Sequence, residues 1–184
     1  MDNNAFLKNT GFKLCPVCAS KDLKDRANSF VCNSCGYVYY QNPATATSCI
    51  IYKADMLLLI ERKNDPGKGL YDLPGGFVDY GETLEQGMKR ELKEEIGIAP
   101  KNLKYYSSKP NKYRFKNVLY HTIDCFFVGK LDDEKGLIAG DDAAKIVWVE
   151  LNKIDLEKFA FESVKSVVRD FLKKKNLSFC FLFY

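Results

Sequence analysis

The stretch "GGFVDYGETLEQGMKRELKEEIGI", residues 75–98, decides the fold. Its paired glycines open a loop, because glycine permits close backbone approach and unusual φ angles. From Thr83 onward apolar residues recur with helical spacing, and Gly97 is a typical stop signal for a helix. The sequence therefore predicts a glycine-rich loop that leads directly into a helix over residues 83–96.

Three glutamates, Glu91, Glu94 and Glu95, crowd the last turns of this helix. At 100° per residue, Glu91 and Glu95 fall within about 20° of Leu84 and continue the apolar line of Leu84 and Met88. Like charges at this spacing repel, and the C-terminal end of the helix dipole disfavours them further. A solvated acidic patch would lie on the other side of the helix. A divalent cation such as Mg²⁺ or Mn²⁺ offsets the repulsion, so the pattern predicts a metal site.

The stretch resembles the signature of the Nudix hydrolases. The matching positions are Gly76, Glu82, Arg90, Glu91, Leu92, Glu94, Glu95, Gly97 and Ile98. The resemblance covers about residues 43–174 and implies the Nudix α/β/α sandwich. Strands that alternate with two substantial helices independently indicate an α/β domain with a mixed sheet.

The resemblance also implies a chemistry. Nudix enzymes hydrolyse a nucleoside diphosphate linked to another moiety and use Mg²⁺ or Mn²⁺. Glu91, Glu94 and Glu95 would bind the metals, one of them helping to deprotonate water, and the carbonyl of Gly75 would be a further ligand. The remaining motif positions would be structural, with Arg90 and Glu82 paired to brace the loop; these positions are Gly76, Glu82, Arg90 and Gly97.

Two later segments supply further candidates. In this family the catalytic base often lies on a later loop, and "AGDDAA" offers Asp141 or Asp142; we select Asp142, with loop solvation as the alternative. In "SSKPNKYRF", Lys112, Tyr113 and Arg114 are candidates for binding a phosphate and an aromatic base. The alternative is a charged loop anchored by one tyrosine.

Four cysteines near the N-terminus form two CxxC pairs: Cys15, Cys18, Cys32 and Cys35. Short CxxC turns suit tetrahedral Zn²⁺, and four thiolates make a closed, structural site. Disulfides and redox chemistry are the alternatives. A zinc ribbon followed by this signature looks like the NADH pyrophosphatase branch of the family. That branch carries a Ser-Gln-Pro-Trp type motif, whereas this chain has Lys109 and Asn111 at its second and fourth positions.

The predicted organisation has three parts: a zinc ribbon over residues 1–40, a Nudix domain over 41–176 and an apolar tail over 177–184. Periodicity predicts strands at residues 44–53, 56–62, 118–131 and 145–151, and a second helix at 156–175. A loop is predicted over residues 64–76, and the tail is expected to form a strand or a plug. Three isolated cysteines, Cys49, Cys125 and Cys180, are expected to be buried.

Composition narrows the class of protein. The 184 residues are 46% hydrophobic and 28% charged, as in a soluble globular protein, and the net charge of +4 is too mild to predict nucleic-acid binding. We expect no membrane span and a cytoplasmic protein, with a homodimer as one oligomeric form. The predicted function is hydrolysis of a diphosphate linkage in NAD(H), ADP-ribose or a related compound. The alternative is a non-catalytic nucleotide sensor or a nucleic-acid-binding regulator.

Overall fold

A computed structural model describes residues 7, 10–131, 134–140 and 143–180. The strands are β1 (Leu23–Asp25), β2 (Ser29–Cys32), β3 (Val38–Tyr40), β4 (Ala44–Lys53), β5 (Met56–Arg62), β6 (Tyr71–Asp72), β7 (Gly75–Phe77), β8 (Lys104–Phe115), β9 (Val118–Lys130) and β10 (Ala143–Glu150). The helices are α2 (Leu84–Ile96) and α3 (Glu162–Cys180), with short 3-10 helices η1 (Leu151–Lys153) and η2 (Leu156–Lys158).

The chain divides into two compact units. The ribbon unit takes the chain up to Ala44 together with residues 112–121, and the sheet unit comprises residues 45–111 and 122–184. The domain division predicted from the sequence stays a prediction. Within the described residues, no helix is both long enough and apolar enough to cross a membrane.

The sheet unit is built on seven strands in the order β10-β5-β4-β9-β8, with β6 paired to β5 and β7 paired to β4. Strands β4 and β5 form an antiparallel hairpin around Ala54, as their aliphatic and β-branched residues predict. Strand β7 pairs antiparallel with β4, so that Thr47 lies opposite Gly76 and Ser48 opposite Gly75. This pairing fixes the glycine-rich loop against the sheet.

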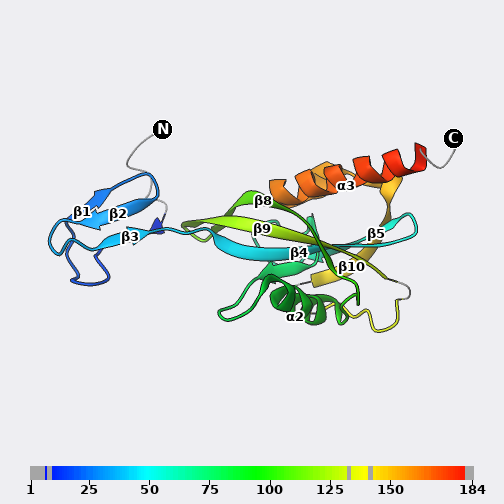
Figure 1. Cartoon of the computed structure of the whole chain (residues 1–184), viewed down its shortest axis with the longest axis horizontal. Coiled ribbons are helices and arrows are strands. Elements are labelled where there is room, and N and C mark those ends of the chain that lie inside the picture. The colour runs from blue at the N-terminus through cyan, green and yellow to red at the C-terminus, as the bar shows by residue number, and fades with distance from the viewer. Residues whose placement is uncertain (1–6, 8–9, 132–133, 141–142, 181–184) are drawn as a thin grey trace. The chain divides into compact units, whose positions relative to one another are not determined.

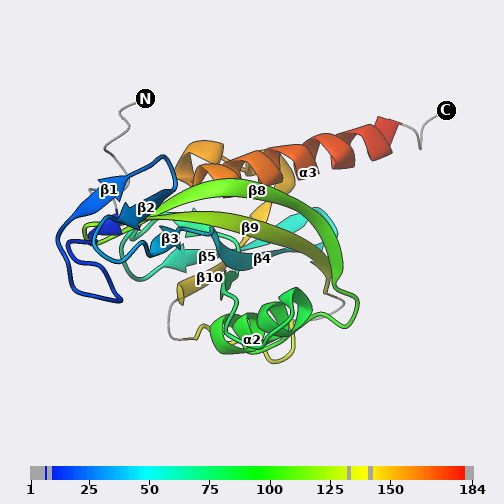
Figure 2. The same ribbon diagram turned by 60° about the vertical axis from the view of Figure 1, so that its left-hand side comes forward.

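Helices α2 and α3 cover opposite faces of this sheet (Figures 1 and 2). Successive residues of β4 point to the two faces in turn. Cys49 and Ile51 pack in one core with Met88 and Leu92 of α2, whereas Ile50 packs in a second core with the buried residues of α3. The predicted α/β/α layers around a mixed sheet are thus confirmed.

Helix α2 has defined signals at both ends. Thr83 is its N-cap: the Thr83 hydroxyl accepts a hydrogen bond from the amide of Gln86, and the Gln86 side chain accepts one from the amide of Thr83. Gly97 ends the helix in the left-handed conformation, with φ of 78°. The acidic residues therefore occupy the last two turns of a well-defined helix.

Several elements differ from the sequence prediction. Strand β8 was not predicted, because its alternation is between polar and aromatic residues and lacks an aliphatic face. Helix α3 begins at Glu162 instead of residue 156, since residues 156–158 form η2 and Phe159 is extended. The predicted loop over 64–76 contains the short strands β6 and β7.

Of the two forms predicted for the C-terminal tail, the strand is wrong for residues 177–180, and the packed plug stays a prediction. These residues continue helix α3 to Cys180, and residues 181–184 lie outside the described part of the chain. Cys49 and Cys125 are buried as expected, while the side chain of Cys180 is outside the described residues.

The ribbon unit contains a three-stranded sheet in the order β1-β2-β3. Phe30 of β2 is fully buried and packs against the rings of Phe12 and Tyr39, with ring centroids 5.4 and 5.5 Å away. This small aromatic cluster is the core of the unit.

Candidate active site

The acidic end of α2 faces the backbone of β7. Glu95 is 7% exposed and the side chain of Glu91 is 14% exposed, whereas the side chain of Glu94 is 58% exposed. The helical angles therefore predicted correctly that Glu91 and Glu95 turn inward. Glu94 lies at the solvent-exposed edge of the same cluster.

Gly75 fixes the position of Glu95. The Gly75 amide donates a 2.7 Å hydrogen bond to Oε2 of Glu95. Gly75 has φ of 151°, and a Cβ at this position would overlap the carbonyl oxygen of Thr47. Glycine is required here both for its conformation and for its size.

Gly76 makes room for Glu91. A Cβ built on Gly76 would lie 2.5 Å from the carboxylate atoms of Glu91, which real Cβ atoms do not tolerate. The Glu91 carboxylate therefore packs directly on the backbone of β7. This burial is the main cause that raises the pKa of Glu91 above its ordinary value.

Arg90 connects the carboxylates of the cluster. Its Nε and NH2 donate hydrogen bonds of 2.8 and 2.9 Å to the two oxygens of Glu82, and NH1 donates to Glu91 and Glu94 at 2.8 and 3.0 Å. NH2 also bonds the carbonyl of Phe77 at 2.9 Å. The bidentate contact with Arg90 lowers the pKa of Glu82. Arg90 thus ties the loop after β7 to the acidic turns of α2.

Negative charge exceeds positive charge in this cluster. Four carboxylates contact Arg90: Asp79, whose oxygen is 3.7 Å from NH2, and those of Glu82, Glu91 and Glu94. Glu95, bonded to the amide of Gly75, adds a fifth on the same helix. One guanidinium cannot neutralise five carboxylates, and partial burial makes the repulsion more costly. Hard oxygen donors with excess negative charge are what Mg²⁺ and Mn²⁺ require, so the donor set fits a divalent cation.

The C-terminal end of α2 also holds a later loop. The amide of Ile138 bonds the carbonyl of Ile96 at 3.1 Å, and the amide of Gly140 bonds the carbonyl of Glu95 at 2.8 Å. These bonds satisfy carbonyls that the helix leaves unpaired. Asp141 and Asp142, the candidate bases, follow Gly140 in the sequence and lie outside the described residues.

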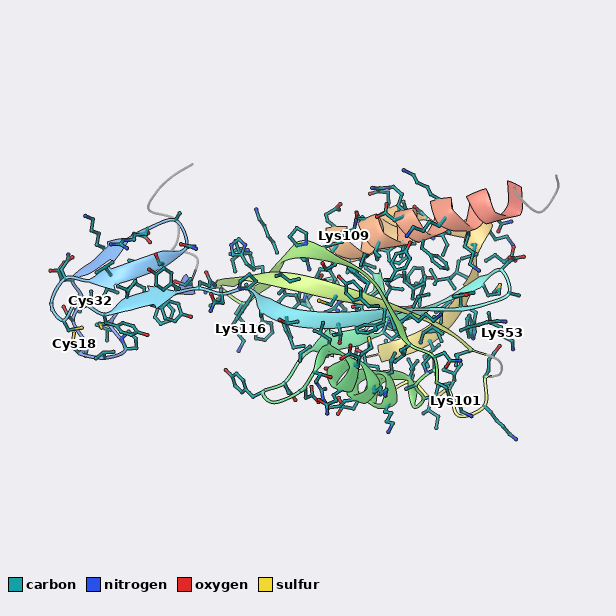
Figure 3. The ribbon with its side chains drawn as sticks, viewed as in Figure 1. Cys18, Cys32, Lys53, Lys101, Lys109 and Lys116 are labelled. Carbon is teal, nitrogen blue, oxygen red and sulfur yellow. The ribbon has the colours of Figure 1, made fainter. Side chains whose placement is uncertain are left out.

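The predicted substrate-binding residues lie on β8, in the part that belongs to the ribbon unit. Lys112 and Arg114 are exposed and Tyr113 is half-buried, and their role stays a prediction. Lys109, at the glutamine position of the NADH pyrophosphatase motif, instead points to α3, where it forms a 2.8 Å ion pair with Asp170 (Figure 3).

The four N-terminal cysteines come together in the ribbon unit; two of them, Cys18 and Cys32, are labelled in Figure 3. Their sulfur atoms all lie within 4.8 Å of one another, with Cys15 to Cys35 at 3.7 Å and Cys18 to Cys32 at 3.6 Å. A tetrahedron with Zn–S bonds of about 2.3 Å has edges of about 3.8 Å, so the geometry fits such an ion. Among the described residues, these four cysteines are the one group of potential metal ligands that lies this close together.

Each CxxC pair is held by the same backbone turn. The amide of Ala19 bonds the carbonyl of Cys15, and the amide of Gly36 bonds the carbonyl of Cys32, both at 2.9 Å. Ala19 and Gly36 both adopt positive φ, of 57° and 77°. Two equivalent turns therefore direct both pairs of sulfur atoms toward one point.

Comparison with known proteins agrees with this geometry. The NUDIX domain family matches residues 42–171. An ADP-ribose pyrophosphatase of Methanocaldococcus jannaschii is 43% identical over 144 residues, which span 76% of this chain and 79% of that protein. The NAD-capped RNA hydrolase NudC of Photobacterium profundum is 37% identical over 97 residues, 52% of this chain and 36% of that protein.

A solved structure shows the same fold. The crystal structure of a NUDIX hydrolase from Nitrosomonas europaea, 24% identical, has a TM-score of 0.68 and covers 90% of this chain and 93% of that one. The chain belongs to the Nudix family, and it is a Nudix pyrophosphohydrolase.

Sequence reasoning missed two residues beside the cluster. Asp79 approaches Arg90, and its amide bonds Oε2 of Glu82 at 3.0 Å; its place three residues before Glu82 was the available signal. Thr47 of β4 lies opposite Gly76, and no sequence pattern links the two, because their pairing depends on the register of the sheet.

Proposed function

We propose that this protein hydrolyses the diphosphate linkage of a nucleoside diphosphate derivative, with ADP-ribose as the first candidate and NAD(H) as the second. The observation that carries the proposal is the acidic cluster of α2, in which Glu91 and Glu95 face inward while Arg90 and the Gly75 amide hold the carboxylates. The 43% identical relative named ADP-ribose pyrophosphatase supports the choice of first substrate.

The proposed cofactor is Mg²⁺ or Mn²⁺, held by Glu91, Glu94, Glu95 and the carbonyl of Gly75. Both the diphosphate and the carboxylates are negative, so they repel each other. The bound cations would supply the positive charge that brings them together, and they would acidify a water molecule.

The protein's own residues would hold the carboxylates in place. Arg90 grips Glu82 with two parallel hydrogen bonds and keeps NH1 between Glu91 and Glu94. Gly75 holds Glu95 by its amide. Glu91 and Glu94 would hold the cation, and the two bonds to Glu82 anchor Arg90 independently of NH1. Because these carboxylates are already held in place, they need to rearrange less during the reaction.

Proton removal and substrate contacts are proposed for residues outside α2. Asp142 would take the proton of the attacking water, because the loop that precedes it is bonded to the carbonyl of Glu95. Lys112 and Arg114 would contact phosphate oxygens, and Tyr113 would contact the base.

We also propose that the cysteine cluster holds a structural Zn²⁺ and that the protein works in the reducing cytoplasm. None of the six cysteines with described side chains forms a disulfide, which suits that compartment. A homodimer stays a prediction.

The function is tested by Mg²⁺-dependent turnover on ADP-ribose, NADH, sugar nucleotides and nucleoside triphosphates. The decisive variant is Glu95→Gln, which keeps an oxygen to accept the Gly75 amide but removes the charge. We expect hydrolysis of at least one compound, and a loss of about 100-fold or more in the variant.

The matched control is Glu85→Gln, which makes the same chemical change on an exposed first-turn residue of α2 and should leave turnover unchanged. Tight nucleotide binding without turnover of any compound, at high Mg²⁺ and Mn²⁺, would instead identify a nucleotide sensor.

A further inference from the structure

Thr47 carries a hydroxyl group that is buried without a hydrogen-bond partner. The residue is 0% exposed, and no described group bonds its Oγ1. A buried hydroxyl without a partner costs free energy, so natural proteins seldom keep one without a reason. Valine has the same shape, is likewise a β-branched strand former and would avoid this cost.

The position of Thr47 in the sheet places its side chain on the face that carries the acidic cluster. Side chains two residues apart on a strand share a face, and Cys49 and Ile51 pack in the core beneath α2. Thr47 is therefore on the α2 face of β4, not on the α3 face where Ile50 packs.

The pairing with β7 locates the hydroxyl more closely. Thr47 is directly opposite Gly76 in an antiparallel pair, and directly opposed side chains lie on the same face about 5 Å apart. Gly76 has no side chain, and the Glu91 carboxylate occupies the space where its Cβ would be. The Thr47 side chain is thus the cross-strand neighbour of the Glu91 carboxylate.

We propose that Thr47 is a positioning residue of the metal site: its hydroxyl hydrogen-bonds an oxygen of the hydrated cation that Glu91 helps to hold. The inference rests on the proposed function, because it requires a divalent cation in the acidic cluster. Mg²⁺ and Mn²⁺ retain water molecules when protein carboxylates bind them, and such water has both donors and lone pairs to offer. The hydroxyl gains its partner only when the cation is bound.

The test uses Mn²⁺ as the probe on the full-length, zinc-loaded protein, with two substitutions. Thr47→Val removes the hydroxyl at constant shape, and Thr47→Ser keeps it. Free Mn²⁺ is followed by its electron paramagnetic resonance signal during titration, and thermal unfolding is followed with and without added Mn²⁺.

The proposal predicts opposite effects on stability and on binding. Without Mn²⁺, Thr47→Val should unfold about 2–4 °C higher than the parent protein, because the unpaired hydroxyl is gone. Its dissociation constant for Mn²⁺ should nevertheless rise about fivefold, as should the Mn²⁺ concentration for half-maximal turnover. Thr47→Ser should bind Mn²⁺ within about twofold of the parent.

The proposal would be overturned if Thr47→Val bound Mn²⁺ as tightly as the parent does. It would also be overturned if Thr47→Ser lost as much Mn²⁺ affinity as Thr47→Val. The Glu95→Gln variant distinguishes a failure of the proposed function from a failure of the role of Thr47. If the parent binds Mn²⁺ in a Glu95-dependent manner but Thr47→Val changes nothing, only the role of Thr47 fails. If binding does not depend on Glu95, the proposed function and the role of Thr47 fail together.

Discussion

Asp72 is a buried carboxylate that the proposed chemistry does not use. It is 7% exposed, pairs with NH1 of Arg62 at 2.9 Å and accepts the amide of Leu73 at 2.9 Å. Burial raises the pKa of Asp72 from 3.8 to about 6, although Arg62 opposes this shift. Because Leu73 leads to the glycines of β7, the pair supports the strand beneath the acidic cluster.

The raised pKa predicts the pH dependence of the Asp72→Asn variant. Between about pH 4 and 6 the folded protein binds the Asp72 proton more tightly than the unfolded chain does. The contribution of protonated Asp72 to the free energy of unfolding is therefore present in acid and is lost as pH rises. Asparagine resembles the protonated carboxyl group and does not ionise, so the variant does not lose this stability as pH rises. Relative to the parent, Asp72→Asn should gain on the order of 1–3 kcal/mol by pH 7, as measured by urea unfolding of Trp148 fluorescence.

Asp170→Asn is the matched control with the opposite sign. The ion pair with Lys109 lowers the pKa of Asp170, so its contribution is present at neutral pH and is lost as pH falls. This variant should be less stable than the parent at pH 7 and should approach it in acid. Parallel pH profiles for Asp72→Asn and the parent would contradict the assignment.

At the scale of single residues, helical spacing was sufficient to predict that Glu91 and Glu95 turn inward, because side-chain direction on a helix follows position. Sequence spacing did not predict that Thr47 lies beside the cluster, because its neighbour Gly76 is set by the register of the strands. The sharing of NH1 between Glu91 and Glu94 depends on side-chain rotamers, and these are fixed only by the packed structure.

At the scale of elements, α2 and the loop 134–140 form one structural unit. The loop supplies amides to the carbonyls of Glu95 and Ile96, and a Cβ on Gly140 would overlap the carbonyl oxygen of Glu94. Gly140 is therefore required for the close approach of two backbones. This contact fixes the position of Gly140, which precedes the candidate base Asp142 by two residues in the sequence.

Gly140→Ala should force the loop away from the end of α2. Loss of the two backbone bonds predicts a decrease in stability of about 1–2 kcal/mol, measured by urea unfolding. If Asp142 is the base, the turnover number should fall more than about tenfold, with a smaller change in KM, in a steady-state assay on ADP-ribose.

Ala139→Gly, at the exposed neighbouring position, is the control and should keep both stability and turnover close to those of the parent. A folded Gly140→Ala variant with full turnover would show that the loop does not need to dock on α2 for catalysis.

The elements differ in how far sequence predicted them. Strands β4 and β5 and helix α2 were predicted to within a residue or two, because each has a clear period and, for α2, caps at both ends. Strand β8 was missed because its partner β9 supplies the pairing that its own polar sequence does not signal. Tertiary pairing overrode local pattern there.

At the scale of the whole molecule, the two units differ in what stabilises them. The sheet unit has two aliphatic and aromatic cores, one on each face of its sheet. The ribbon unit has three short strands, a core around Phe30 and the cysteine cluster. The grouping of residues 112–121 with the ribbon could not be predicted from sequence, since it arises from contacts between distant segments.

This contrast predicts two unfolding steps when zinc is removed. Units with so small a core usually need a metal to fold, so Cys32→Ser or zinc chelation should unfold the ribbon unit. The sheet unit, which contains the single tryptophan Trp148, should keep its fluorescence transition within about 1 kcal/mol of the zinc-loaded protein. Circular dichroism and Co²⁺ absorption report on the ribbon, and Trp148 reports on the sheet unit.

Turnover after zinc removal tests the role of the ribbon. When Mg²⁺ is restored after chelation, turnover should recover. Complete loss of turnover in a protein whose sheet unit is still folded would mean that the ribbon takes part in the reaction and does not only stabilise its own unit.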